Sequence, residues 1–192
     1  MAKHESNLKD MNVLLGVSGG VAAYKAVDLA SKLAAAGAKI KTVMTESACE
    51  FIKPKSFEAV TGLEVYTSLW SSPDEYKIGH ISLADWSDIA VVVPATANII
   101  GKIANGICDD LLSTVLCASW QKVKILAPAM NDKMWNNPAV QQNVKTVKEM
   151  GFELIGPVEG RLACGTEAIG RMAEAADILE RVVKLASEIN NK

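Results

Sequence analysis

The sequence predicts a single-domain α/β fold, in which helices wind doubly around a parallel sheet of the Rossmann-like or flavodoxin-like kind. Two observations support this fold class. Short, largely apolar runs such as residues 89–93 (IAVVV) and 123–127 (VKILA) are typical of strands buried on both faces. Longer segments with helical periodicity separate these runs, so that strand and helix alternate along the chain. The 192 residues, 49% of them hydrophobic, suffice to bury one sizeable core.

The first two strands and the helix between them form a predicted βαβ unit. Residues 12–18 (NVLLGVS) are an apolar run that ends in Ser-Gly-Gly, which predicts a buried strand followed by a loop. Apolar residues at helical spacing predict a helix over residues 21–37, which Gly37 closes. The alternating residues 39–44 (KIKTVM) predict the second strand, and the crossover between the parallel strands should be right-handed.

The remaining elements continue this alternation. Residues 46–60 predict a helix broken near Pro54, and residues 63–79 carry the glycine, proline and serine residues of a loop. The later expected elements are a helix beginning at His80, a strand over residues 89–93, a helix over 97–119, a strand over 123–127, a helix over 138–150, a strand over 152–156 and an amphipathic helix over 172–189.

Composition and charge narrow the possible function classes. The formal net charge of -2 and the pI near 5.8 give no electrostatic support for binding to nucleic acid or to an anionic membrane. No apolar run reaches the ~18 residues of a membrane span. The polar residues 1–11 predict a tail and not a signal peptide, which leaves one domain over residues 12–192. No CxxC pair occurs, so we expect neither a zinc site nor a disulfide framework, and we expect a reduced cytoplasmic setting.

Small residues follow the first predicted strand, at the sheet edge where ligands of such folds bind. Ser18, Gly19 and Gly20 allow a ligand to approach the backbone, and free N–H groups at the start of the following helix bind anions. The loop suits a phosphate, but it equally suits a tight turn, and the dinucleotide fingerprint GxGxxG is absent. Thr45, after the second strand, either adds a hydroxyl to the same phosphate or caps a helix.

Two further loops carry side chains that suit a ligand. Thr96, Ala97 and Asn98 follow the strand of residues 89–93, and they suit either the rim of a flat polar ring or the cap of the next helix. Residues 128–138 (PAMNDKMWNNP) crowd two methionines, a tryptophan and three asparagines into one loop. A loop has little packing reason to carry that set, which favours a ligand site over a plug above the core.

His80 and Cys164 are the candidates for proton transfer. His80 is the only histidine outside the N-terminal tail, and a single histidine is more often structural than catalytic. Cys164 stands within residues 160–166 (GRLACGT), a predicted mobile loop, where an accessible thiol is a candidate proton donor. The other three cysteines fall in apolar helical contexts and are expected in the core.

These motifs occur together, and in this order, in a known family. The segment PAMNDKMW matches, at every fixed position, the Pro-x-Met-Asn-x-x-Met-Trp signature of the homo-oligomeric flavin-containing cysteine decarboxylases. Residues 94–98 (PATAN) resemble the family's Pro-Ala-Ser-Ala-Asn motif, with Thr96 for serine. Residues 163–172 (ACGTEAIGRM) resemble its substrate clamp, which usually begins Ala-Cys-Gly-Asp, and here Thr166 replaces the aspartate. The resemblance extends over residues 12–174.

The resemblance implies a role for each candidate residue. The residues implied to bind FMN are Ser18, Gly19, Gly20, Thr45, Phe51, Thr96, Ala97, Asn98 and Ala129. Those implied to bind the substrate are Asn131, which holds the carboxylate, together with Met134, Ala163 and Gly165. His80 is implied to act in the oxidative half of the reaction. Cys164, on a clamp that closes over the substrate, is implied to donate a proton in the reductive half.

The resemblance also implies a reaction, decarboxylation of a cysteine carboxylate, and a homotrimer or a dodecamer of trimers. The clamp motif favours phosphopantothenoylcysteine, on the route to coenzyme A, over the C-terminal cysteine of a lantibiotic precursor peptide. A non-catalytic regulatory flavoprotein of the same fold is a third reading, but the chain retains His80, Asn131 and Cys164. The PAMNDKMW segment speaks against a flavin prenyltransferase. Because one helix follows the clamp, we expect a separate ligase to supply the substrate.

Overall fold

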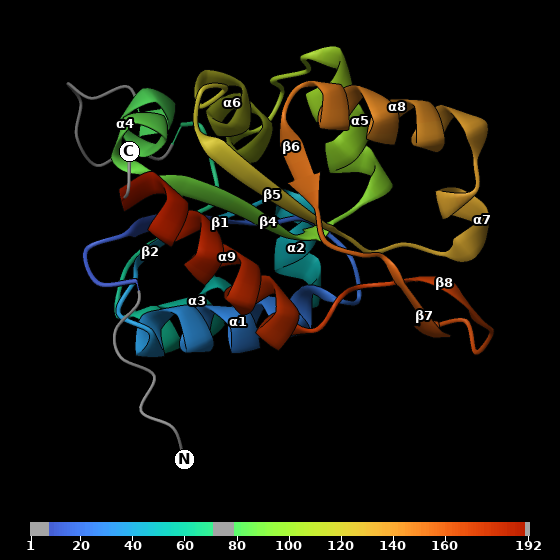
Figure 1. Cartoon of the computed structure of the whole chain (residues 1–192), viewed down its shortest axis with the longest axis horizontal. Coiled ribbons are helices and arrows are strands. Elements are labelled where there is room, and N and C mark those ends of the chain that lie inside the picture. The colour runs from blue at the N-terminus through green and yellow to red at the C-terminus, as the bar shows by residue number, and fades with distance from the viewer. Residues whose placement is uncertain (1–7, 71–78, 191–192) are drawn as a thin grey trace.

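The computed structural model describes residues 8–70 and 79–190, in which a parallel sheet lies between two layers of helices (Figure 1). The strands of this sheet are β1 (Asn12–Val17), β2 (Lys39–Met44), β3 (Val65–Tyr66), β4 (Ile89–Ala95), β5 (Val123–Pro128) and β6 (Phe152–Leu154). They lie in the order β3-β2-β1-β4-β5-β6, and each neighbouring pair is parallel. This is the Rossmann order and not the flavodoxin order, so the structure decides between the two predicted kinds.

The other elements surround this sheet. Strands β7 (Val158–Arg161) and β8 (Glu167–Arg171) form an antiparallel hairpin of their own. The helices are α1 (Ala23–Ala35), α2 (Glu46–Phe51), α3 (Pro54–Thr61), α4 (Gly79–Trp86), α5 (Ala97–Asn105), α6 (Leu111–Ala118), α7 (Asp132–Trp135), α8 (Pro138–Glu149) and α9 (Ala175–Asn190).

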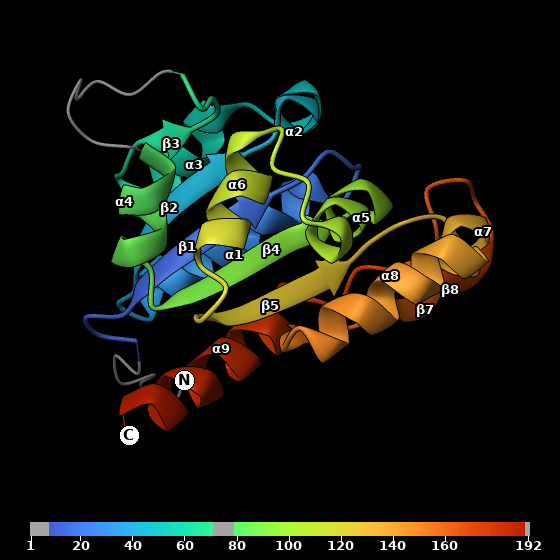
Figure 2. The same ribbon diagram turned by 90° about the horizontal axis from the view of Figure 1, so that it is seen from above.

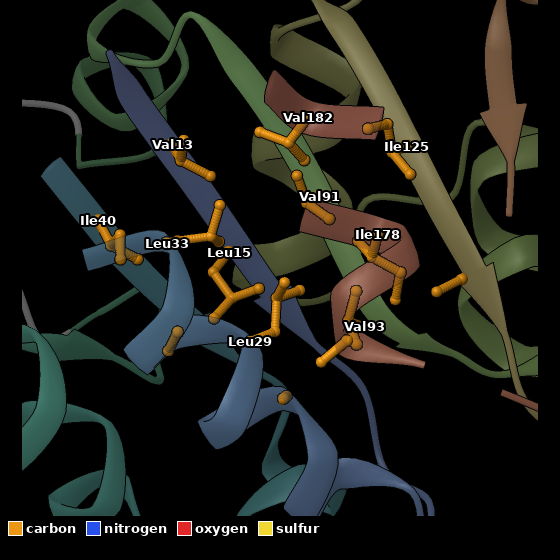
Figure 3. Close-up of a cluster of buried hydrophobic side chains, with 14 of the residues drawn as sticks. Val13, Leu15, Leu29, Leu33, Ile40, Val91, Val93, Ile125, Ile178 and Val182 are labelled. Atoms are coloured by element: carbon orange, nitrogen blue, oxygen red, sulfur yellow. The ribbon is translucent and has the colours of Figure 1, made fainter. Parts of the chain in front are cut away.

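Side chains of the central strands alternate between the two helical layers. In β4, Val91 and Val93 belong to the core shared with α1 and α9, whereas Val92 belongs to the core shared with α5, α6 and α8. Figure 3 shows the first of these cores, in which Leu29 of α1 and Ile178 of α9 lie against the strands. Because both faces of β4 are buried, its sequence is a continuous apolar run, as predicted.

The sequence predicts one helix over residues 97–119, and the structure corrects this to two. Gly106 ends α5 with a left-handed φ of 66°, a conformation that favours glycine. Asp110 begins α6, since its carboxylate accepts the Ser113 N–H at 2.8 Å while the Ser113 hydroxyl accepts the Asp110 N–H. Apolar residues continue on both sides of this break, which is why periodicity alone predicts a single helix.

Several short elements lie in segments that were predicted as loops. Strand β3 lies within the predicted loop of residues 63–79, helix α7 within residues 128–138, and the hairpin β7–β8 frames the predicted mobile loop of residues 160–166. Strand β4 continues through Pro94 to Ala95, and β5 ends at Pro128, so both extend beyond their predicted ends. Elements of two to five residues are too short to produce a recognisable period.

The N-terminal segment contributes to the core. Leu8 and Met11, from the predicted polar tail, are buried, and the Leu8 N–H donates to the carbonyl of Ala36 at 3.2 Å. Residues 1–7 of that tail, and residues 71–78 of the predicted loop, lie outside the described residues. Within residues 8–70 and 79–190, no helix has the length and apolar character that a membrane span requires.

Candidate functional site

A cavity of about 1110 Å³ opens at the carboxyl ends of the central strands. It lies at the switch point between β1 and β4, where ligands bind in sheets of this kind. Figure 2 shows β4 and β5 running toward the end of the molecule that carries α5, α7 and the hairpin. The cavity brings together these predicted site residues: Ser18, Gly19, Gly20, Thr45, Thr96, Ala97, Asn98, Ala129, Asn131, Met134, Ala163 and Cys164.

Residues 18–22, the glycine loop, form one wall and offer backbone donors. Within the described part of the chain, the N–H groups of residues 19–22 donate to no protein acceptor, and α1 begins without a side-chain cap. These N–H groups stand at the positive end of a 13-residue helix, where a phosphate is favoured. A Cβ on Gly19 would lie 2.4 Å from the Cβ of Ser47, so only glycine lets this loop pack against α2.

The Ser18 hydroxyl belongs to the scaffold of this wall. It donates to the carbonyl of Pro94 at 2.8 Å and accepts the N–H of Thr96 at 3.1 Å. A serine hydroxyl has one proton, so the Thr96 hydroxyl, 3.0 Å away, is the donor in the contact between the two hydroxyl groups. These bonds tie the glycine loop to the loop after β4 and leave its backbone N–H groups as the donors that it can offer to a ligand.

Thr45 adopts the capping role that the sequence left open. Its hydroxyl oxygen accepts the N–H of Ala48 at 3.2 Å at the start of α2. Thr45 also lines the cavity, and its hydroxyl still has a proton to donate. Capping and ligand binding are therefore compatible at this residue.

Asn131 and Cys164 meet in the cavity although 33 positions separate them in the chain. The amide nitrogen Nδ2 of Asn131 donates to Cys164 Sγ at 3.4 Å, and the hydroxyl of Thr166 lies 3.0 Å from the same sulfur. The other amide atom, Oδ1, accepts the Lys133 N–H at 2.9 Å and caps α7. This cap fixes the rotation of the amide, so that its NH2 group points to the thiol.

The same contacts make the Cys164 thiol more acidic. The side chain is exposed, and the hydrogen bond with the Thr166 hydroxyl, with a smaller contribution from Asn131, lowers the pKa of the thiol below its usual value. Hydrogen bonds to sulfur favour the thiolate, because they stabilise the charged form more than the neutral one. The site thus holds an accessible acid next to a neutral amide donor.

The segment of residues 128–138 is partly a plug and partly a cavity wall. Trp135 and Met130 are half-buried against the core between the sheet and α5, α6 and α8. Met134 is exposed and lines the cavity. Capping explains two of the three asparagines, because Asn131 caps α7 and Asn137 caps α8. One side of this segment therefore packs on the core, and the other side lines the cavity.

The hairpin β7–β8, which carries Cys164, is attached to the rest of the domain at two further places. The Met130 N–H donates to the carbonyl of Gly170 at 3.0 Å. A Cβ on Gly170, whose φ is 144°, would lie 2.3 Å from the Met130 carbonyl oxygen, so this approach requires glycine. Glu174 then accepts from Arg171 at 3.1 Å and from Lys25 of α1 at 3.0 Å.

Comparison with known proteins shows the family. A family model described as Flavoprotein matches residues 1–187. The chain belongs to the flavoprotein family. The resemblance predicted from its motifs is thereby confirmed at the level of the family.

Curated relatives of this flavoprotein are enzymes of coenzyme A biosynthesis. It is 50% identical over 181 residues to the coenzyme A biosynthesis bifunctional protein CoaBC of Bacillus subtilis (strain 168), covering 94% of this chain and 43% of the relative. It is 39% identical over 185 residues to the protein of the same name from Escherichia coli (strain K12), covering 96% and 45%. The flavoprotein thus spans less than half the length of these relatives.

Solved structures share the fold of this flavoprotein. A mutant PPC decarboxylase complexed with pantothenoylaminoethenethiol superimposes with a TM-score of 0.83 and 36% identity, over 94% of this chain and 100% of the other. The FMN-dependent cysteine decarboxylase SpaF superimposes with a TM-score of 0.81 and 31% identity, over 93% and 98%. The doubly wound α/β fold predicted from the sequence is therefore confirmed.

The residues of the flavoprotein fit a flavin mononucleotide. The cavity is larger than the roughly 300–1,000 Å³ of a site for one small ligand, so it has room for a nucleotide and a substrate. One glycine loop supplies donors for one phosphate, in keeping with the absence of GxGxxG. Ala97 and Ala129 are small residues of the wall beyond this loop, which leaves space for a flat ring.

Three predicted site residues do not line the cavity of this flavoprotein. His80 is the second residue of α4, which lies at the opposite end of the molecule from α7 and the hairpin in both views (Figures 1 and 2). Phe51 ends α2 with 56% of its surface exposed. Gly165 shapes the hairpin turn, since its φ is 91° and its N–H donates to the carbonyl of Leu162 at 2.9 Å.

Charged residues of the cavity wall were missed by the sequence analysis. Lys102 pairs with Asp109 and Asp110, each at 2.6 Å, across the break between α5 and α6. The hydrogen bond from Lys102 lowers the pKa of the Asp109 carboxyl. A single charge on a helix, such as Lys102, is typical of a solvent-exposed face. The adjacent Asp109 and Asp110, shortly after Gly106 ends α5, could have marked this loop as part of the site.

The expectation that three cysteines lie in the core is wrong for two of them. Cys108 and Cys117 are exposed, and Cys49 is half-buried. Cys117 lies on α6 among apolar neighbours, but Val115 and Leu116 take the buried face of that helix. An apolar context in sequence does not reveal which face of a short helix meets the core.

Proposed function

We propose that this chain is an FMN-dependent decarboxylase that converts phosphopantothenoylcysteine to phosphopantetheine in coenzyme A biosynthesis. One observation carries the proposal: the amide of Asn131 and the thiol of Cys164 lie 3.4 Å apart in a cavity that the glycine loop also lines. A neutral carboxylate-binding group and an acid thus face the place where a flavin and a substrate would meet. The relatives and the solved structures named above support the same reaction.

The backbone N–H groups of the glycine loop would hold the FMN phosphate, with the hydroxyl of Thr45 beside them. Thr96, Ala97, Asn98 and Ala129 would border the ring. When bound, FMN supplies the reversible oxidation of the substrate CH2–S⁻ group to a thioaldehyde, which lets the neighbouring carboxylate leave as CO2.

Asn131 binds the substrate carboxylate before the C–C bond breaks. Its NH2 group is the donor, since Oδ1 is occupied by the Lys133 N–H. A neutral amide holds a carboxylate less firmly than an arginine would, so it opposes the change from anion to neutral CO2 less strongly. Met134, exposed at the same wall, shapes the space around the carboxylate.

Cys164 acts after CO2 has left. Loss of CO2 leaves an enethiolate, and the Cys164 thiol donates its proton to the carbon that carried the carboxylate. The lowered pKa of the thiol suits an acid that must give up a proton near neutral pH. The ligand of the solved relative is itself an ethenethiol, the chemical class of this intermediate.

A cationic side chain favours the phosphorylated substrate over a peptide. Arg161 lines the cavity and has no ion-pair partner among the described residues, although Glu167 stands opposite it in the hairpin ladder. Arginine is well suited to a phosphate because its guanidinium donates two parallel hydrogen bonds. A peptidyl-cysteine decarboxylase, the alternative function, has no need for a cation at this position.

The assembly and the cellular setting are also proposals. A homotrimer, or a dodecamer of trimers, would let His80 of one copy reach the cavity of another, since His80 does not line the cavity of its own chain. A ligase outside residues 1–192 would supply the substrate. Four free cysteines agree with a reduced cytoplasmic setting.

Two experiments test the proposal. The purified protein should be yellow, and the released cofactor should run as FMN and not FAD on chromatography. It should then be mixed with phosphopantothenoylcysteine and, separately, with an epidermin-type peptide, and the products weighed by mass spectrometry. Loss of CO2 from the small substrate alone supports the proposal, loss from the peptide alone supports the alternative, and no loss from either contradicts both.

A further inference from the structure

Thr166 makes the shortest side-chain contact with the proposed proton donor. Its hydroxyl oxygen lies 3.0 Å from Cys164 Sγ, whereas the Asn131 amide lies 3.4 Å away. The clamp motif that this chain resembles has an aspartate at the position of Thr166. Thr166 therefore contacts the thiol directly, and it differs from the aspartate that is usual at this position of the clamp motif.

The hairpin turn holds the two side chains together. The Gly165 N–H donates to the carbonyl of Leu162 at 2.9 Å, and the Leu162 N–H donates to the carbonyl of Thr166 at 2.8 Å. Gly165 has a left-handed φ of 91°, which glycine adopts without strain. This conformation folds Thr166 back toward Cys164, so the contact follows from the backbone of the turn.

Only neutral groups shape the acidity of the thiol. The charged residues of the surrounding elements are Asp132 and Lys133 on α7 and, on the hairpin, Glu159, Arg161, Glu167 and Arg171. None of them contributes to the lowered pKa of Cys164, which comes first from the Thr166 hydroxyl. A carboxylate in place of that hydroxyl would put a negative charge beside the sulfur and oppose ionisation.

We propose that Thr166 is a positioning residue, which holds the Cys164 thiol through its hydroxyl and keeps it acidic enough to protonate the carbon that CO2 has left. The inference rests on the proposed function, because it uses Cys164 as the donor. In this step the S–H bond breaks and a C–H bond forms at that carbon. The enethiolate electron pair becomes the C=S bond, and the thiolate left on Cys164 accepts hydrogen bonds from Thr166 and Asn131.

The first test measures the thiol itself and needs no turnover. The substitutions Cys49→Ser, Cys108→Ser and Cys117→Ser leave Cys164 as the single thiol, and its alkylation rate by iodoacetamide is followed against pH by mass spectrometry. Thr166→Val should raise the apparent pKa, because a hydrogen bond to the thiolate is lost. Thr166→Asp should raise it further, because a like charge is added.

Two variants separate this role from a merely structural one. Thr166→Ser keeps the hydroxyl and should titrate like the parent protein. Thr146→Val, on α8, removes a hydroxyl that bonds only to its own helix and should also leave the titration unchanged. An unchanged titration in Thr166→Val, or a shift of equal size in Thr166→Ser, overturns the proposal.

The second test measures products in the protein that retains all its cysteines. Thr166→Val should release a larger share of the enethiol, which is lighter than the saturated thiol by two hydrogen atoms, whereas Thr166→Ser should release the same share as the parent protein. An unchanged share in Thr166→Val overturns the catalytic part. If the unsubstituted protein decarboxylates neither substrate, the proposed function fails, whereas the alkylation titration still decides whether Thr166 sets the acidity of Cys164.

Discussion

The two walls of the cavity are built in different ways. The glycine loop is tied into the body of the domain, because Ser18 is only 2% exposed and its hydroxyl bonds to the backbone of Pro94 and Thr96. The hairpin stands outside the main sheet, and residues 163–167 of its turn are all exposed. It reaches the domain through contacts at Gly170, Glu174 and Cys164.

This difference matches two separate tasks. A wall bonded into the core keeps one geometry, which suits a cofactor that stays bound through many reaction cycles. A wall attached by a few contacts can open at low cost in free energy, which suits the entry of substrate and the release of product. Substitutions in the glycine loop should therefore change stability and cofactor retention, whereas substitutions around the hairpin should change chemistry while the domain stays folded.

Asn131→Asp should have the largest effect on activity, at the point where the hairpin meets the body of the domain. The aspartate still caps α7, but the NH2 donor is lost, and a negative charge faces the thiol and the proposed position of the substrate carboxylate. We expect turnover to fall by about 10²–10³-fold, the usual cost of removing one essential donor. The rate of CO2 release measures this change in turnover. Asn136→Asp, at the end of the same helix, is the matched control and should stay active.

Cys164→Ser should have the next largest effect, and it should change the product as well as the rate. Serine is a far weaker acid, so formation of the saturated thiol should fall roughly 100-fold. The released compound should be the enethiol, seen by mass spectrometry. Cys117→Ser replaces another exposed thiol away from the cavity lining and should behave normally. Release of ordinary product from Cys164→Ser at a normal rate would exclude this thiol as the proton donor.

Two glycine substitutions test the difference between the walls directly. Gly19→Ala places a Cβ 2.4 Å from the Ser47 Cβ, and we expect it to cost about 1–3 kcal/mol of unfolding free energy and to release FMN. Gly170→Ala clashes with the Met130 carbonyl and should displace the hairpin, lowering turnover by roughly tenfold or more through misplacement of Cys164. Denaturant unfolding and flavin fluorescence follow the first effect, and steady-state kinetics the second.

The comparison depends on the two variants responding differently. Gly170→Ala should keep its flavin and should unfold at a denaturant midpoint close to that of the parent. Gly101→Ala, within α5, has room for its Cβ and serves as the control for both. Equal losses of stability in Gly19→Ala and Gly170→Ala would contradict the idea that the hairpin is energetically separate from the core.

Lys25→Ala should have the smallest effect, since it removes one ion pair at the base of the hairpin. Exposed pairs contribute about 0.2–1 kcal/mol, and Glu174 keeps its second partner, Arg171. We expect KM to rise by no more than about fivefold, with the rise becoming smaller at high salt. Lys32→Ala removes an ion pair on the same helix, with Asp28, and should leave KM unchanged. A large loss of turnover in Lys25→Ala would instead point to direct contact with a ligand.

The sequence by itself determined the class of the fold and the loops that line the cavity. Strands buried on both faces are continuous apolar runs, and the loops that follow them must meet at one edge of a parallel sheet. That local reasoning sufficed to bring Gly19, Thr96 and Asn131 into one site, which the structure contains. It also marked Cys164, because a cysteine among glycines lies outside any apolar period.

Only the tertiary structure decided how these residues share their bonds. The sequence does not show that the Ser18 hydroxyl is committed to Pro94, or that the Cys164 thiol meets Asn131 and Thr166. Such contacts depend on the register of strands and on a turn that reverses the chain, and both are fixed by packing between distant segments. Periodicity reports which face of an element is buried, but it carries no information on which distant group that face meets.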